Sequence, residues 1–167
     1  MNSYKKFIER TGFIGHRPVF FDKYAMVVGT CKGFGAKEVT EYMKGIFTSY
    51  GFNVVSSLEL QISTKSEKEQ KYNKDKTIKE FTGFIEKMKK GEKTRPTIMQ
   101  VVMFNLLKYV SEEDKDYLTT DYEYYKDKDN FFYNTKIPFF KKVIAKQEIK
   151  KFKKDMDENR MRIDNVF

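Results

Sequence analysis

The segment spanning residues 24–50 constrains the fold more than any other part of the chain, because it has the pattern of a strand, a loop and a helix. Residues 24–28 form a short, almost entirely apolar run, which is typical of a strand covered on both faces. Glycines punctuate residues 29–35, where the chain must turn. Residues 36–50 then place apolar side chains at helical spacing, and Gly51 can supply the left-handed end of the helix.

A second strand follows this helix directly. Residues 52–56 are mostly apolar, and Leu58, Leu60 and Ile62 alternate with other residues behind them. Because a strand, a crossover helix and another strand are expected to be parallel, the sequence predicts an α/β fold. Ligands bind beyond the carboxyl ends of parallel strands in such folds, so residues 30–35 are the first candidates for a site.

The chain carries a formal net charge of +9, which raises the question of an anionic partner. Most of this charge comes from lysines that are mixed with Glu and Asp, as in residues 65–79 and 141–154, and no DNA- or RNA-binding motif is visible. We therefore expect a solvated basic surface and no nucleic-acid partner. A nucleotide phosphate is the alternative, and a nucleic-acid or membrane-surface binder would rest on charge alone.

The chain contains one cysteine and one histidine, which limits the disulfides and metal sites that it can form. With only Cys31 and His16, one chain can form neither an internal disulfide framework nor a multi-cysteine or two-histidine metal site. We therefore predict a cytoplasmic protein without a metal site. The most apolar run, residues 98–110, contains Asn105 and Lys108 and is shorter than the roughly 20 residues of a membrane span, so we expect no membrane segment.

Four further helices are predicted from apolar side chains at helical spacing, at residues 4–12, 78–88, 97–110 and 139–156. Residues 63–75 are charged and poor in apolar side chains, which predicts a mobile loop, and residues 121–133 predict an aromatic, acidic linker. The helix at 97–110 is apolar on most sides, so it is either central or packed against a second subunit. We favour the subunit contact, because two strands offer too little sheet to cover this helix.

Several runs together resemble one family, the flavodoxin-like NAD(P)H-dependent FMN reductases. The runs are Lys5-Lys6-Phe7-Ile8-Glu9-Arg10, His16-Arg17-Pro18, Phe21-Asp22-Lys23 and Ala25-Met26-Val27-Val28-Gly29-Thr30. The similarity covers residues 1–62, and the Asp121-Tyr122-Glu123-Tyr124-Tyr125 region resembles a helical extension that some members carry. The family's amino-terminal half, with three strands and the serine-rich loop for the FMN phosphate, has no counterpart here.

The resemblance implies a partial flavodoxin-like parallel sheet with a helical C-terminal extension. Residues 1–95 would be the C-terminal half of the flavodoxin-like domain, and residues 96–167 would be the extension, packed on that domain or on a second subunit. An oxidoreductase of this kind passes hydride from NAD(P)H through FMN to an acceptor. The missing half implies a homo-oligomer or a complementing chain as partner.

The resemblance also implies a flavin site, formed by Thr30, Cys31, Lys32, Gly33, Phe34 and Gly35. Cys31 and Lys32 stand where the family has small residues. Cys31 is either a redox-active thiol or a replaced small residue, Lys32 either meets a phosphate or is solvated, and Phe34 packs on the flavin or on its own helix. The alternative to a reductase is a non-catalytic remnant or an oligomeric interaction module without the phosphate loop.

Overall fold

The computed structural model describes residues 2–62, 66–91 and 95–164, with side chains for 5–62, 66–91 and 95–158. The chain divides into two compact units, Met1–Thr94 and Arg95–Phe167. The first unit contains a two-stranded parallel sheet with flanking helices, and the second contains helices only, among them a long C-terminal helix. The fold is therefore mixed α/β, as the sequence predicts.

The first unit has six elements in chain order: α1 (Asn2–Thr11), α2 (Phe13–His16), β1 (Tyr24–Cys31), α3 (Ala36–Ser49), β2 (Asn53–Gln61) and α4 (Glu67–Lys89). β1 and β2 are parallel, with Tyr24 opposite Asn53 at one end and Cys31 opposite Gln61 at the other. The predicted parallel pair is thus confirmed. Gly51 adopts a φ of 100° just after α3, as expected of the glycine that ends a helix.

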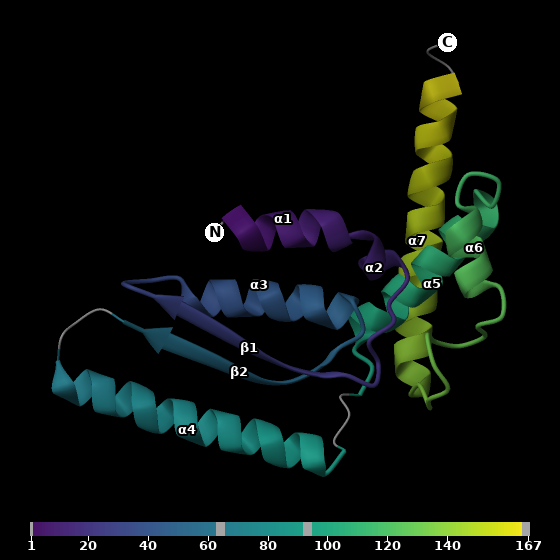
Figure 1. Ribbon diagram of the computed structural model, residues 1–167. Coiled ribbons are helices and arrows are strands. Elements are labelled where there is room, and N and C mark those ends of the chain that lie inside the picture. The colour runs from purple at the N-terminus through teal and green to yellow at the C-terminus, as the bar shows by residue number, and fades with distance from the viewer. Residues whose placement is uncertain (1, 63–65, 92–94, 165–167) are drawn as a thin grey trace. The chain divides into compact units, whose positions relative to one another are not determined.

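Two helices cover opposite faces of the sheet, with α3 on one face and α4 on the other, alongside β2 (Figure 1). Val27 of β1 is fully buried on the α3 face, which it shares with Gly29, whereas Leu58 of β2 is fully buried on the opposite face, which it shares with Ser56. On the α4 side, Lys87 Nζ donates to Val55 O at 2.8 Å, and Ser56 Oγ donates to Glu80 Oε2 at 3.0 Å. The two faces thus differ, because α3 packs on both strands, whereas α4 packs on β2 and also forms hydrogen bonds with its backbone and polar groups.

Two predicted boundaries in this unit are wrong. β1 continues beyond residue 28 to Cys31, so Gly29 and Thr30 belong to the strand and not to the loop. Residues 66–75 are not a mobile loop either, because α4 begins at Glu67; residues 63–65 lie outside the described residues. The first turn of α4 carries Glu67 and Glu69, which stabilise a helix N-terminus through its dipole.

The apolar stripe that predicts the helix at 78–88 does not face the sheet. Its four members are between 41% and 56% exposed, and they are Ile78, Phe81, Ile85 and Met88. The less exposed face of α4 at this level includes Glu80 and Phe84. The stripe therefore identifies the helix correctly but lies on its outer side.

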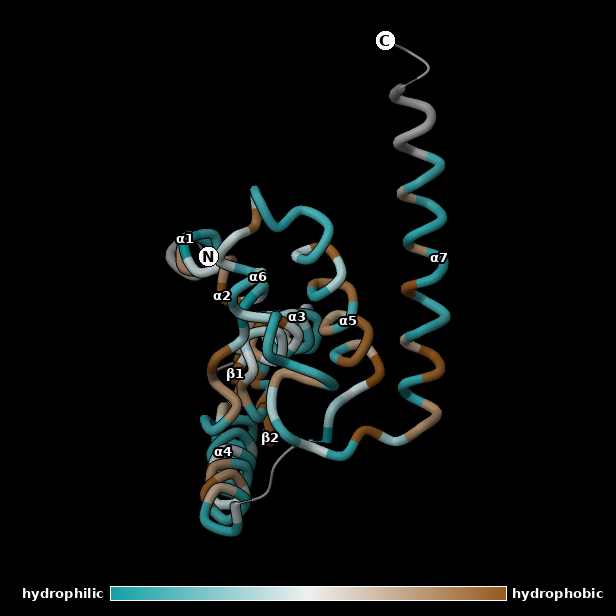
Figure 2. The backbone as a smooth tube through the Cα atoms, turned by 90° about the vertical axis from the view of Figure 1, so that its right-hand side faces the viewer, coloured by the Kyte–Doolittle hydropathy of each residue, from teal (hydrophilic) through white to brown (hydrophobic). Residues whose placement is uncertain are grey.

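The second unit consists of α5 (Ile98–Glu113), α6 (Thr119–Tyr125) and α7 (Phe139–Asp164). Figure 2 shows the contrast between α5, which is apolar along most of its length, and α7, which alternates between polar and apolar residues. The buried core of this unit contains Val101 and Phe104 of α5, Tyr125 of α6 and Ala145 of α7, together with Phe131 and Ile137 from the segment between α6 and α7. Helix 97–110 is thus central to its own unit, the first of the two alternatives that its composition leaves open.

The predicted linker at 121–133 is instead part of this core. The Phe104 ring lies 5.8 Å from the Tyr125 ring and 5.9 Å from the Phe131 ring, centroid to centroid. Aromatic side chains bury large areas, so a tyrosine-rich and phenylalanine-rich segment of this kind packs rather than links.

Within the described residues, no helix is long and apolar enough to cross a membrane.

Candidate ligand site at the carboxyl end of the sheet

The predicted site residues run from the end of β1 to the residue that precedes α3. Thr30 and Cys31 are the last two residues of β1, and Gly35 is the N-cap of α3, with a φ of 99°. Lys32, Gly33 and Phe34 lie between them and are exposed. The sequence thus places the segment correctly, at the carboxyl end of a parallel strand where α/β folds bind ligands.

A cavity of about 430 Å³ opens at this end of the sheet. Three of the six predicted residues line it: Cys31, Gly33 and Gly35. The other three do not. In particular, the Phe34 side chain is fully exposed and does not cover α3, which excludes that alternative in this structure.

The backbone of the loop faces open space. A Cβ atom built on Gly33 or Gly35 would meet no other atom within 4 Å. No side chain caps the N-terminus of α3, whose first residues Ala36 and Lys37 also line the cavity. The first backbone N–H groups of a helix have no partner within that helix, so this wall presents hydrogen-bond donors to a ligand.

The end of β2 supplies a second wall through Glu59 and Gln61. The Glu59 carboxylate contacts α3 through Thr40, which is fully buried. Thr40 Oγ1 lies 3.2 Å from Glu59 Oε1 and 2.8 Å from Lys37 O. Thr40 can thus orient Glu59 toward the first turn of α3. The carboxylate can accept hydrogen bonds, and it lines the same cavity as the backbone N–H donors at the start of α3.

The third wall comes from α4, through Glu69, Tyr72, Asn73 and Lys76. Asn73 Nδ2 donates to Gln61 O at 2.9 Å, and Lys76 Nζ donates to Glu59 O at 2.8 Å. These two bonds fix the N-terminal half of α4 against the end of β2. The cavity therefore depends on α4 as much as on the loop.

The sequence misses the residues of β2 and α4 in this cavity. The signal for Glu59 and Gln61 is present, because the carboxyl ends of neighbouring parallel strands lie side by side. The signal for α4 is weaker, since its first two turns carry mainly charged and polar side chains, which also occur in loops. No group of three or more His, Cys, Asp or Glu side chains is placed to hold a metal ion in the part of the chain that the structure describes.

The thiol of Cys31 is half-buried, and its Sγ atom lies 3.3 Å from Gly33 O, to which it can donate a weak hydrogen bond. The charged groups that line the cavity are Lys37, Lys76, Glu59 and Glu69. Cations and carboxylates are thus balanced, which suits a ligand with both donors and acceptors better than a purely anionic one.

The chain matches no protein-family model, no curated protein and no solved structure at a significant level. The function of this chain must therefore be inferred from the geometry of its two units.

Proposed function

We propose that this chain is a flavodoxin-like protein related to NAD(P)H-dependent FMN reductases, and that the cavity at the carboxyl end of β1 and β2 holds the isoalloxazine ring of FMN. The observation that carries the proposal is the position of Cys31, Gly33 and Gly35, which line a cavity beyond the carboxyl ends of two parallel strands. The segment that resembles the family's flavin loop thus contributes three residues to the cavity.

The residues present suit the ring portion of this cofactor. The cavity volume of about 430 Å³ lies within the range of roughly 300–1,000 Å³ typical of small-ligand sites. The open backbone at Gly33 allows a flat ring to approach closely, and the first turn of α3 offers donors to the polar edge of the ring.

When bound, FMN supplies the hydride chemistry, accepting hydride from NAD(P)H and passing it to an acceptor. The role of this chain is then to bind and orient the ring. Gly33 leaves the space for the ring, and Glu59, oriented by Thr40, accepts a hydrogen bond from a ligand N–H. Tyr72 forms an outer aromatic wall of the same cavity.

A titration of the purified protein with FMN, followed by quenching of flavin fluorescence, tests the proposal. We expect saturable quenching for the wild-type chain. Gly35→Val should weaken binding by roughly tenfold or more, because Gly35 has a φ of 99° that a β-branched residue does not adopt without strain. Gly33→Val tests the same site without that backbone strain, since its side chain would only fill the open space above the loop.

Gly45→Ala is the matched control, because Gly45 lies within α3 and a Cβ there would also meet nothing. It should leave FMN binding unchanged. Absence of saturable quenching by the wild-type chain, or equal affinity in all the glycine variants, would contradict a flavin site at this loop.

A second candidate function, an oligomeric interaction module, is favoured by the outer edge of β1. No other strand within the described residues pairs with this edge. Natural edge strands are usually guarded by charged side chains, but residues 24–31 contain none in a chain that is 34% charged. Two copies of β1 could therefore approach each other without like-charge repulsion, and we propose a dimer through β1 of a second copy of this chain.

Measurement of the molar mass in solution by light scattering tests this dimer against the monomer mass of 20.0 kDa. Val28→Lys places a charge on an exposed position of β1 and should shift the dimer toward the monomer. Val39→Lys, on the exposed side of α3, is the matched control and should leave the mass unchanged. A wild-type monomer at every concentration would contradict the dimer.

A further inference from the structure

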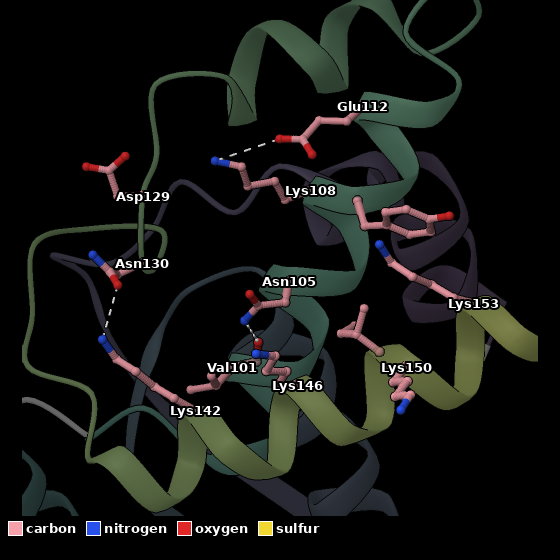
Figure 3. Close-up of a pocket in the computed structure, with 12 residues that line it drawn as sticks. Val101, Asn105, Lys108, Glu112, Asp129, Asn130, Lys142, Lys146, Lys150 and Lys153 are labelled. Carbon is pink, nitrogen blue, oxygen red and sulfur yellow. Dashed lines mark hydrogen bonds and ion pairs between the residues drawn. The ribbon is translucent and has the colours of Figure 1, made fainter.

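The second unit contains a groove of its own, with a volume of about 580 Å³, between α5 and α7. Five lysines surround it, and they are Lys108, Lys142, Lys146, Lys150 and Lys153. Only two carboxylates, Glu112 and Asp129, lie among the lining residues. Figure 3 shows Lys142 and Lys153 extending from α7 toward the opposite wall, where α5 and the loop with Asn130 lie. The groove therefore has an excess of positive charge from two helices.

The lysines of α7 are not distributed evenly around the helix. Residues 142, 146, 150 and 153 follow one another at intervals of four, four and three, which places them along one face. Away from the groove, Lys151 pairs with Glu148 at 2.7 Å, and Lys154 pairs with Glu158 at 3.7 Å. Outside the groove, two lysines of α7 thus have carboxylate partners on the same helix, and four others follow one another along the groove.

Like charges four residues apart destabilise a helix, so repulsion between these lysines destabilises α7 unless a bound anion offsets it. Two of the groove lysines contact a polar or acidic side chain of the same unit. Lys142 Nζ donates to Asn130 Oδ1 at 3.1 Å, and Lys108 Nζ lies 3.9 Å from Glu112 Oε1. Lys146 and Lys150 have neither a hydrogen bond nor an ion pair with any residue that the structure describes. These two ammonium groups are the ones most available to a ligand.

We propose that the groove between α5 and α7 binds a compact polyphosphate anion, through Lys146 and Lys150 with Lys142 and Lys153 at its ends. Each ammonium group offers three donors, and phosphate oxygens are strong acceptors for charge-assisted hydrogen bonds. The proposal concerns the second unit only and does not depend on flavin binding by the first.

The lining favours a compact anion over a nucleic-acid strand. Proteins that bind single strands combine cations with aromatic platforms on which bases stack. Tyr109 is the single aromatic residue that lines this groove, and Lys153 Nζ already covers one face of its ring at 3.8 Å from the centroid. The cavity volume also falls within the range of small-ligand sites.

Isothermal titration of the full-length chain with inorganic tripolyphosphate, at low ionic strength, tests the proposal. We expect saturable binding at one site per chain. The double variant Lys146→Gln/Lys150→Gln should bind roughly tenfold more weakly or worse, because two charge-assisted contacts are lost. ATP and adenosine distinguish the sources of the anion: ATP should bind through its phosphates at least as well as tripolyphosphate, and adenosine should not bind.

The double variant Lys151→Gln/Lys154→Gln is the matched control, because it removes the same charge from the same helix outside the groove. It should change the affinity by less than about twofold, and circular dichroism of both variants should show the wild-type helix content. Equal losses in the two double variants would mean non-specific attraction and would overturn the proposal. Absence of tripolyphosphate binding would overturn it too, including the case in which a single-stranded oligonucleotide binds instead.

Discussion

At the scale of single residues, Gly29 shows how closely α3 approaches the sheet. A Cβ at this position would lie 2.6 Å from Thr40 Cγ2 and 2.9 Å from Ala36 O. The glycine is therefore required by packing and not by its φ, which is not among the positive values of the chain. This contact sets the height of the first turn of α3 above β1, and with it one wall of the cavity.

We predict that Gly29→Ala destabilises the protein by about 1–3 kcal/mol, because the new methyl group overpacks the contact with α3. Denaturant unfolding followed by circular dichroism would measure the change. Gly33→Ala is the control, since a Cβ there meets no atom and its effect should be small. A similar loss for both variants would contradict the packing explanation.

Tyr124 is the residue whose ionisation the second unit changes most clearly. Burial raises the pKa of Tyr124 from 10.0 to about 12, because the charged phenolate is poorly solvated there. The folded state thus holds the phenol proton more tightly than the unfolded state does. Its contribution to stability is fully present below about pH 10 and is lost as the pH rises toward about 12.

Absorbance titration of the tyrosines can follow this group, since the chain contains no Trp. We predict that Tyr124→Phe removes one component that titrates near pH 12 and makes unfolding stability less dependent on pH between about 10 and 12. Loss of a component near pH 10 instead of near pH 12 would show that Tyr124 ionises as a solvated phenol does.

At the scale of elements, the start of α5 is defined by a complete capping box. Gln100 N donates to Thr97 Oγ1 at 3.1 Å, and Thr97 N donates to Gln100 Oε1 at 2.9 Å. We predict that Thr97→Ala costs about 0.5–2 kcal/mol, whereas Thr97→Ser keeps the hydroxyl and most of the stability. Thermal unfolding of the two variants would measure this, and equal losses would argue against the hydroxyl as the cap.

Elements that carry an apolar run or apolar side chains at regular spacing could be predicted from the sequence, and β1, α3, β2 and α5 are examples. The first turns of α4 could not, because they are mainly Glu, Lys and Gln. These residues are good helix formers but do not distinguish a helix from a charged loop. The stripe from Ile78 to Met88 predicts its helix, yet nothing in its spacing shows that it faces outward.

The core around Phe104 is an example of information that spacing does not contain. Tyr125 and Phe131 contact this residue from a short helix and an irregular segment, which have no regular apolar period. Their burial follows from tertiary contacts between α5 and residues more than 20 positions away. The sequence shows the aromatic content, but the structure is needed to show that these rings form a core.

At the scale of the whole molecule, the two units suggest two separate ligand sites with different chemistry. The first site has balanced charges around an open loop backbone, and the second has an excess of lysine. The sequence locates one wall of the first site, because Gly33 and Gly35 follow a recognisable strand that ends at Cys31. For the second site it shows the lysine-rich run at 141–154 but not the groove, because the lysines of α5 and α7 converge only in the folded unit.

Amide chemical-shift mapping of the ¹⁵N-labelled chain during titration with FMN would test the claim that the carboxyl end of β1 and β2 binds the flavin ring, as we propose. We predict saturable shifts confined to residues 30–37, to Glu59 and Gln61 at the end of β2, and to the first turns of α4, with amides of α5 and α7 unchanged. Shifts confined to α5 and α7, or none at all, would contradict the claim.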